Sequence, residues 1–121
     1  MQAISEILDE FPEVVTLSDE VYDFLTFDGR KHIPFATVGN NWERTVSIYS
    51  GGKLFNATGW KVGWTIAPER LIHLGGVIAN TTFYCFSVPG QEAMSNALDF
   101  VEKPYLDTGK TYVDAVRDIF I

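Results

Sequence analysis

The sequence predicts an α/β fold in which helices flank a sheet with parallel strands. An amphipathic segment at residues 4–11 precedes a short apolar run at residues 14–17, which is the helix-then-strand order of an α/β unit. Two further strand-like runs, at residues 45–49 and 62–67, enclose a glycine-rich turn. Of the 121 residues, 46% are hydrophobic and 14% aromatic, so the composition is typical of a packed domain and not of a disordered segment.

The first helix and strand follow from their apolar spacing. Ile4, Ile7, Leu8 and Phe11 fall on one helical face, and Pro12 is expected to end the helix. The run at residues 14–17 suits a strand that is buried on both faces, as in a parallel sheet. Residues 18–22 would then lie at the carboxyl end of this strand, where open α/β sheets bind ligands.

Residues 22–45 have no regular pattern. Asp28-Gly29 and Gly39-Asn40 are turn signals, so we interpret this stretch as a surface excursion. His32 within it could act as a general base, but a structural or exposed role is favoured.

The turn at residues 50–64 is predicted to be a binding turn because its glycines make both a poor helix and a poor strand. Lys53 follows Gly51 and Gly52, which let the backbone approach a ligand closely. Lys61 comes eight residues later, so both amines could flank one pocket and bind an anion such as phosphate. The alternatives are two solvated surface lysines, or a generic anion-binding module. The spacing excludes a Walker phosphate loop.

The C-terminal half is predicted to be helical. A helix is expected after Pro68, with an interruption at Gly75-Gly76, and two more after Pro89 and Pro104. An aromatic cluster at residues 81–87 includes Cys85, which is expected to be a buried apolar thiol.

Composition also argues against several function classes. The net charge of -7 and the pI of about 4.6 disfavour nucleic acid or an anionic membrane as a partner. One cysteine and two distant histidines leave no intramolecular disulfide and no metal-ligand constellation. The sequence has no transmembrane run and no signal peptide, so a cytoplasmic location is expected, or a mitochondrial one if a transit peptide is missing.

Two motifs carry a family resemblance. The stretch SGGKLFNATGWKVGW at residues 50–64 and SDEVY at residues 18–22, with the segment up to His32, resemble the class I aminotransferases of fold type I that use pyridoxal phosphate. The similarity is greatest to the group of kynurenine aminotransferases, glutamine transaminase K and cysteine-conjugate β-lyases. It extends from about Glu6 to Leu98.

The resemblance implies roles for five residues. Lys53 would form the Schiff base with pyridoxal phosphate and then act as the general base. Asp19 would face the pyridine nitrogen of the cofactor, and a carboxylate there favours the protonated ring that serves as an electron sink. Tyr22 would contact the phenolic oxygen. Ser50 and Lys61 would bind the phosphate, with Lys61 standing where many relatives carry arginine.

The resemblance leaves other residues open. Glu20 is expected to face outward and has no assigned role. Phe83 and Tyr84 are candidate substrate contacts, with core packing as an equal alternative. Trp60 and Trp64 are expected to pack in the core or on the sheet.

At the level of domains, residues 1–121 are expected to be an incomplete large, cofactor-binding domain with one antiparallel strand, without its N-terminal segment and the C-terminal small domain. The expected activity is amino transfer from a kynurenine-like, aromatic or glutamine donor to a 2-oxo acid. A cysteine-conjugate β-lyase with the same cofactor and a truncated, non-catalytic fragment are the alternatives. The entire protein is expected to be a homodimer.

Overall fold

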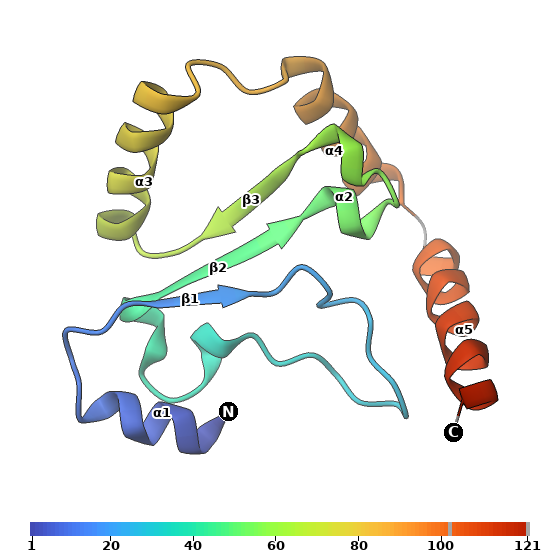
Figure 1. Cartoon of the computed structure of the whole chain (residues 1–121), viewed down its shortest axis with the longest axis horizontal. Helices are drawn as coiled ribbons and strands as arrows, with labels where there is room; N and C mark the ends of the chain where they lie inside the picture. The colour runs from blue at the N-terminus through green and yellow to red at the C-terminus, as the bar shows by residue number, and fades with distance from the viewer. Residues whose placement is uncertain (102, 121) are drawn as a thin grey trace.

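The chain folds around a three-stranded sheet with strand order β1-β2-β3 (Figure 1). This computed structural model describes residues 1–101 and 103–120. Strand β1 (Thr16–Asp19) runs parallel to β2 (Thr45–Ser50), and β3 (Gly63–Ile66) runs antiparallel to β2. The predicted α/β class is therefore confirmed, including the single antiparallel strand.

The register of the sheet brings two strand ends together. Asp19 pairs with Ile48 across the parallel ladder, and Ser50 pairs with Gly63 across the antiparallel one. Because β1 and β2 are parallel, their carboxyl ends lie at the same edge of the sheet. The segments that follow both strands therefore begin at this edge.

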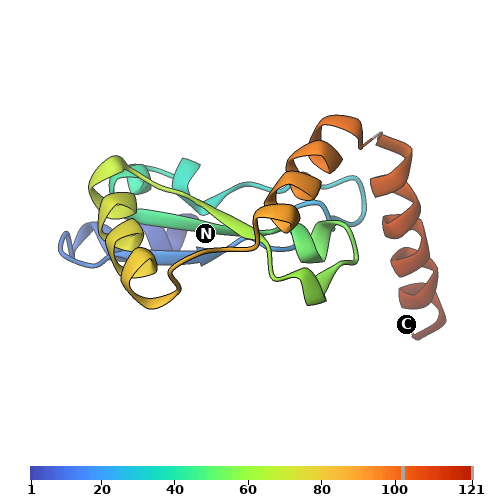
Figure 2. The same cartoon turned by 90° about the horizontal axis from the view of Figure 1, so that it is seen from above.

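The helices surround the sheet on several sides. Figures 1 and 2 show α3 at one end of the molecule, and α4 and α5 toward the other. The described residues form the α-helices α1 (Gln2–Asp9), α2 (Gly51–Leu54), α3 (Glu69–Thr82), α4 (Val88–Phe100) and α5 (Lys103–Phe120), and the 3-10 turns η1 (Phe35–Thr37), η2 (Asn41–Arg44) and η3 (Thr58–Trp60).

The two faces of the sheet differ in what covers them. On one face, Thr45 and Ser47 of β2 are buried, and nearby Asn41 donates hydrogen bonds to Ser5 Oγ (2.9 Å) and to the Val38 carbonyl (2.8 Å). On the other face, α3 stands across a depression of about 630 Å³. Leu17 on that face is 70% exposed. The buried centre described here is thus small and largely polar.

The first helix and strand differ in part from their predictions. Strand β1 begins at Thr16, and the preceding Val14 and Val15 are exposed, so this strand is not buried on both faces. In α1, the predicted apolar face is exposed at Ile4 and Ile7, and the buried residue is Ser5 on another side of the helix.

Two helix predictions were also wrong. The glycine-rich turn does contain a helical turn, α2, which the Ser50 hydroxyl caps by accepting a hydrogen bond from the Lys53 N–H. Helix α3 continues through Gly75 and Gly76, since its backbone hydrogen bonds persist without any side chain there. The helices predicted after Pro68, Pro89 and Pro104 are confirmed.

The stretch between β1 and β2 is more buried than a surface excursion. It contains only the 3-10 turns η1 and η2, yet Phe35 and Ala36 are among its buried residues. Cys85, in contrast, is exposed and not buried as predicted, because the segment between α3 and α4 lies on the surface. Among the residues described, no helix is both long and apolar enough to cross a bilayer.

Candidate functional site

Lys53 lies at the carboxyl edge of the sheet, on the short helix that follows β2. Ser50 ends β2 in extended backbone, and its Oγ accepts a hydrogen bond from the Lys53 N–H at 3.3 Å. This cap fixes where the helix begins and therefore where Lys53 projects. The Lys53 side chain is half-buried.

The glycines before Lys53 are required by packing within the chain. A Cβ on Gly52 would come within 2.9 Å of Thr58 Cα, and one on Gly51 would overlap the side chain of Met94. Both glycines are buried. The close packing of α2 against η3 and α4 therefore explains why glycines stand here, without the predicted approach of the backbone to a ligand.

The Lys53 amine lies beside an aromatic ring. Its Nζ is 6.0 Å from the centre of the Tyr22 ring, a distance at which a cation and the π face attract each other. In the described part of the chain, no carboxylate lies within ion-pair distance of Lys53. The amine opens on a depression of about 430 Å³ that is lined by Tyr22, Phe24, Leu25, Lys53, Leu54, Asn56, Tyr105, Leu106 and Val113.

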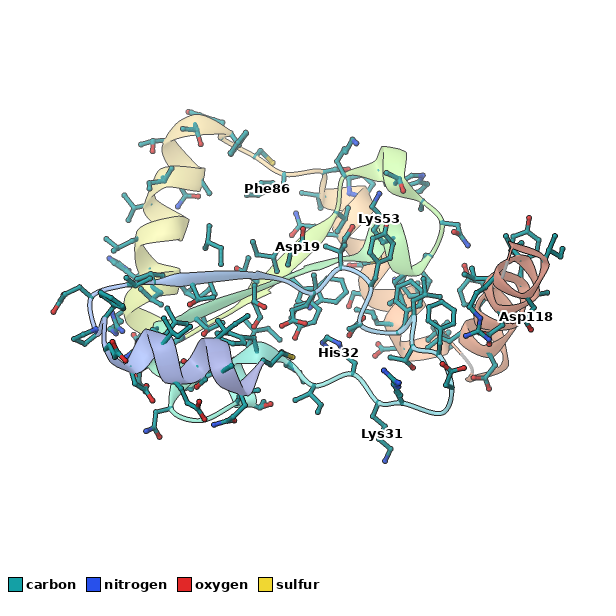
Figure 3. All side chains as sticks on the ribbon, turned by 60° about the horizontal axis from the view of Figure 1, so that its bottom comes forward. Asp19, Lys31, His32, Lys53, Phe86 and Asp118 are labelled. Atoms are coloured by element: carbon teal, nitrogen blue, oxygen red, sulfur yellow. The ribbon has the colours of Figure 1, made fainter. Side chains whose placement is uncertain are left out.

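Asp19 lies at the same edge, at the end of β1. It pairs with Ile48, and since alternate residues of a strand point to one face, Asp19 and Ser50 project from the same face of the sheet. The Asp19 carboxylate is exposed and accepts a hydrogen bond from the Val21 N–H at 3.4 Å. Figure 3 shows Asp19 and Lys53 at this end of the strands. The sheet topology therefore brings Asp19, Tyr22, Ser50 and Lys53 to one edge.

Glu20 does not point outward, as the sequence suggested, but is buried at 5% exposure. Its Oε1 accepts hydrogen bonds from Ser18 Oγ (2.7 Å) and the Phe35 N–H (3.0 Å), and its Oε2 lies 2.5 Å from His32 Nε2. Burial raises the pKa of this carboxyl, but the bonds from Phe35 and Ser18 and the nearby His32 outweigh burial and lower the pKa below its ordinary value. Sequence reasoning missed this residue because the signal lies in partners distant along the chain.

Lys61 follows η3, eight residues after Lys53. It ends η3 in the left-handed region, with φ of 55°, and its side chain is exposed. It lines a separate depression of about 320 Å³ with Val62, Gly63, Phe86, Ser87 and Gln91. That both amines flank one pocket therefore stays a prediction for Lys61. Its assignment to a phosphate stays a prediction.

The predicted aromatic residues are mostly on the surface. Phe83 and Tyr84 are 66% and 95% exposed, so the core-packing alternative fails for both, and their contact with a substrate stays a prediction. Trp64 stacks on Tyr49 with ring centres 5.8 Å apart, which confirms sheet packing, whereas Trp60 is exposed. In the described residues, no group of three or more His, Cys, Asp or Glu side chains is placed to hold a metal ion.

Known proteins share both the sequence and the fold. The chain is 48% identical over 103 residues to a kynurenine–oxoglutarate transaminase of Dictyostelium discoideum, covering 82% of this chain and 23% of that protein. It is 38% identical over 117 residues to human kynurenine–oxoglutarate transaminase 3, covering 96% and 25%. The structure of N-succinyldiaminopimelate aminotransferase from Mycobacterium tuberculosis matches with a TM-score of 0.87 and 37% identity, over 97% of this chain and 30% of that one.

These matches also show what share of its relatives' length the chain spans. It spans about a quarter of the length of the curated relatives it matches. The sequence model of one family, aminotransferase class I and II, matches residues 1–121, which include both motifs and all four residues gathered at the carboxyl edge of the sheet. The chain therefore belongs to the aminotransferase class I and II family.

Proposed function

We propose that the protein containing this chain transfers an amino group from an amino acid to a 2-oxo acid, with pyridoxal phosphate held by Lys53. The observation that carries the proposal is the position of the Lys53 amine. It lies at the carboxyl edge of the sheet, 6.0 Å from the Tyr22 ring centre, without a carboxylate partner in the described residues. Class I and II aminotransferases generally depend on this cofactor.

The donor set at the edge suits the chemical groups of pyridoxal phosphate. The cofactor has an aldehyde, a pyridine nitrogen, a phenolic oxygen and a phosphate. The chain offers an amine on Lys53, a carboxylate on Asp19, a phenol on Tyr22 and a hydroxyl on Ser50. When bound, the cofactor supplies an electron sink for the bonds at the substrate α-carbon.

Lys53 has two tasks in this proposal. Its Nζ, as a neutral amine, would hold the cofactor covalently through its aldehyde carbon. The depression around it is lined mainly by apolar side chains such as Leu25 and Leu54, which limit the water around the amine. Once the incoming amino acid has freed Nζ, the same atom would remove the proton from the substrate α-carbon.

Four other residues would orient the cofactor. The Asp19 carboxylate would hold a proton at the ring nitrogen, and the Tyr22 hydroxyl would donate a hydrogen bond to the phenolic oxygen. Ser50 already accepts a bond from the Lys53 N–H, so its own hydroxyl proton remains available to a phosphate oxygen. Lys61 would add a positive charge on the phosphate side.

The substrate class follows from the named relatives. Two similar proteins are called kynurenine–oxoglutarate transaminases, which supports a kynurenine-like or aromatic amino donor and 2-oxoglutarate or a similar 2-oxo acid as acceptor. A glutamine donor belongs to the same proposal. The exposed Phe83 and Tyr84 are the proposed contacts for the donor side chain. We also infer a homodimer for the entire protein, and light scattering would test it.

A trapping experiment tests the role of Lys53. The chain is mixed with pyridoxal phosphate, treated with borohydride to make the carbon–nitrogen link permanent, and digested for peptide mass mapping. We expect the added mass on Lys53 alone, and none anywhere in Lys53→Ala. Lys31→Ala, a change at an exposed lysine outside the site, should bind as well as the unchanged chain. Label that persists at other lysines in Lys53→Ala would overturn the proposal.

Product analysis on the entire protein tests the reaction type. With kynurenine and 2-oxoglutarate, we expect glutamate to form in step with the loss of kynurenine. With a cysteine conjugate and no 2-oxo acid, pyruvate and ammonia in excess of any transfer product would favour the β-lyase instead.

A further inference from the structure

The carboxylate of Glu20 closes a long loop at its base. Residues 21–34 leave the end of β1 and return to η1, and the contacts of Glu20 join the two ends of this excursion. On the far side, Glu20 meets His32 Nε2 at 2.5 Å and the Phe35 N–H at 3.0 Å. The pair is largely buried, with side-chain exposures of 4% for Glu20 and 30% for His32.

The surroundings of Glu20 make this contact strong. Its Oε1 also accepts a hydrogen bond from Ser18 of β1, so both carboxylate oxygens have partners. Tyr49 on β2 lies within the electrostatic influence of Glu20 and of Asp23 on the loop. His32, in contrast to these groups, can carry a positive charge to match Glu20. A buried carboxylate with a charged hydrogen-bond partner resists separation.

The loop has a weaker restraint at its tip. There Asp28 pairs with Arg117 of α5 at 3.1 Å, and Arg117 also lies over the Phe27 ring. The Asp28 side chain is 64% exposed, so this ion pair adds little to the free energy of the loop. The buried contact at the base therefore dominates the position of the loop.

Three residues of the loop form one wall of the depression at Lys53. Tyr22, Phe24 and Leu25 line the same depression as Lys53. Glu20 directly follows Asp19, the last residue of β1, and its N–H still donates to the Ile48 carbonyl at 2.9 Å, so the two side chains point to opposite faces. Figure 3 shows His32 on the other side of β1 from Asp19. His32 and Phe35 hold Glu20 on the opposite face of the sheet, and they thereby keep Asp19 on the face that it shares with Ser50.

We propose that Glu20 and His32 form a latch at the base of the 21–34 loop, which holds Tyr22 beside Lys53 and Asp19 on the cofactor face. Glu20 and His32 are then positioning residues, since neither touches the cofactor. This inference rests on the proposed function for its consequence at Lys53. The latch itself depends only on the contacts of Glu20.

Amide hydrogen exchange of the 121-residue chain tests the latch without any cofactor. Two amides report on it: that of Phe35, which is bonded to Glu20, and that of Leu25, which is bonded to the Tyr22 carbonyl inside the loop. We expect Glu20→Gln and His32→Gln to speed exchange at both amides by about tenfold, as expected when a buried charged hydrogen bond is lost. Exchange within β2 should change far less. The matched controls are the exposed residues Glu13→Gln and His73→Gln, which should change neither amide.

A double-mutant cycle then separates positioning from general stability. The affinity for pyridoxal phosphate is measured for Glu20→Gln, Tyr22→Phe and the double variant. If the latch positions Tyr22, Glu20→Gln weakens binding by about tenfold, and the added loss of the Tyr22 hydroxyl costs less than about twofold. Losses that multiply independently would overturn the positioning role. His32→Gln gives the same comparison should Glu20→Gln fail to fold.

The outcomes distinguish this inference from the proposed function. If the entire protein takes no cofactor on Lys53, the proposed function fails, and hydrogen exchange alone decides the latch. If the cofactor binds but Glu20→Gln and His32→Gln leave both the affinity and the Leu25 amide unchanged, the latch is overturned while the function stands.

Discussion

Gly52 and Thr58 are packed backbone against backbone: a Cβ on Gly52 would lie only 2.9 Å from Thr58 Cα. Real Cβ atoms do not approach other atoms so closely, and a backbone atom cannot turn aside as a flexible side chain can. We expect Gly52→Ala to lower the free energy of unfolding by about 2 kcal/mol or more, as overpacking does. Urea unfolding followed by circular dichroism measures it. A loss below half that size would mean that η3 moves easily.

Replacing glycine by alanine should have the opposite effect on the free energy of unfolding in α3. A Cβ on Gly75 would have no other atom within 4 Å, and this glycine lies inside a helix that continues past it. We therefore expect Gly75→Ala to raise the free energy of unfolding by about 0.5–1 kcal/mol, the usual gain of alanine over glycine within a helix. Differential scanning calorimetry should show a higher Tm. A lower Tm would indicate that α3 needs the flexibility of glycine.

The buried Glu20 should make part of the stability depend on acid pH. The pKa of this carboxyl is lowered from its ordinary value of 4.5, because the bonds from Phe35, Ser18 and His32 together outweigh burial, the largest single influence. A lowered pKa in the folded state stabilises the fold fully above pH 4.5, and this contribution is lost as pH falls through the folded value.

The check compares the chain with Glu20→Gln. Urea unfolding at a series of pH values should show a stability gap at neutral pH that narrows below pH 4.5, where the unchanged chain loses its advantage. Every other carboxylate is common to both proteins, so the difference isolates Glu20. A gap that stays constant down to acid pH would contradict the assignment.

The hydroxyl of Tyr49 should lose its proton at a higher pH than that of an ordinary tyrosine. Burial raises its pKa above the ordinary 10.0, the negative charges of Glu20 and Asp23 raise it further, and the bond with Ser47 opposes them. The stabilisation from neutral Tyr49 is therefore present below pH 10.0 and is lost as pH rises through the folded value.

Absorbance titration of phenolate, with the curve of Tyr49→Phe subtracted, isolates this residue from the other tyrosines. The phenylalanine ring should keep the stack on Trp64. In Glu20→Gln the Tyr49 titration should move toward lower pH, since one of the two negative charges is gone. An unmoved curve would mean that burial alone sets the pKa.

Local patterns predicted the features that depend on neighbours in sequence. The alternation at residues 45–49 became β2, and the motif that follows placed Lys53 at its carboxyl end. Asp19 could be placed at the same edge because parallel strands end together. These inferences needed only strand direction and the order of elements.

Other features depend on contacts that no local pattern encodes. Glu20 was expected to face outward, but it is buried by His32 and Phe35, which are twelve and fifteen residues further on. The apolar stripe of α1 predicted burial at Ile4, yet the helix packs through Ser5, whose hydroxyl meets Asn41. The glycines before Lys53 suggested room for a ligand, whereas the fold uses that room for its own atoms.

The two serine caps offer a last, paired prediction. Ser50 and Ser87 each begin a helix in the same way: Ser50 Oγ accepts from the Lys53 N–H at 3.3 Å, and Ser87 Oγ accepts from the Gly90 N–H at 3.2 Å. Removing either hydroxyl should lower the free energy of unfolding by about 1 kcal/mol, the usual worth of such a cap.

Their effects on cofactor binding should differ. Ser50→Ala removes a proposed phosphate donor and loosens the backbone that aims Lys53, so we expect pyridoxal phosphate to bind about tenfold more weakly, as for a lost charged hydrogen bond. Ser87→Ala destabilises a helix start that lines the Lys61 depression and not the Lys53 depression; because Ser87 has no proposed contact with the cofactor, the affinity should stay within about twofold, a difference of less than about 0.5 kcal/mol. Titration of both variants with the cofactor separates the two cases. Equal losses would mean that Ser50 acts only through stability, and the phosphate would then need another ligand on this edge.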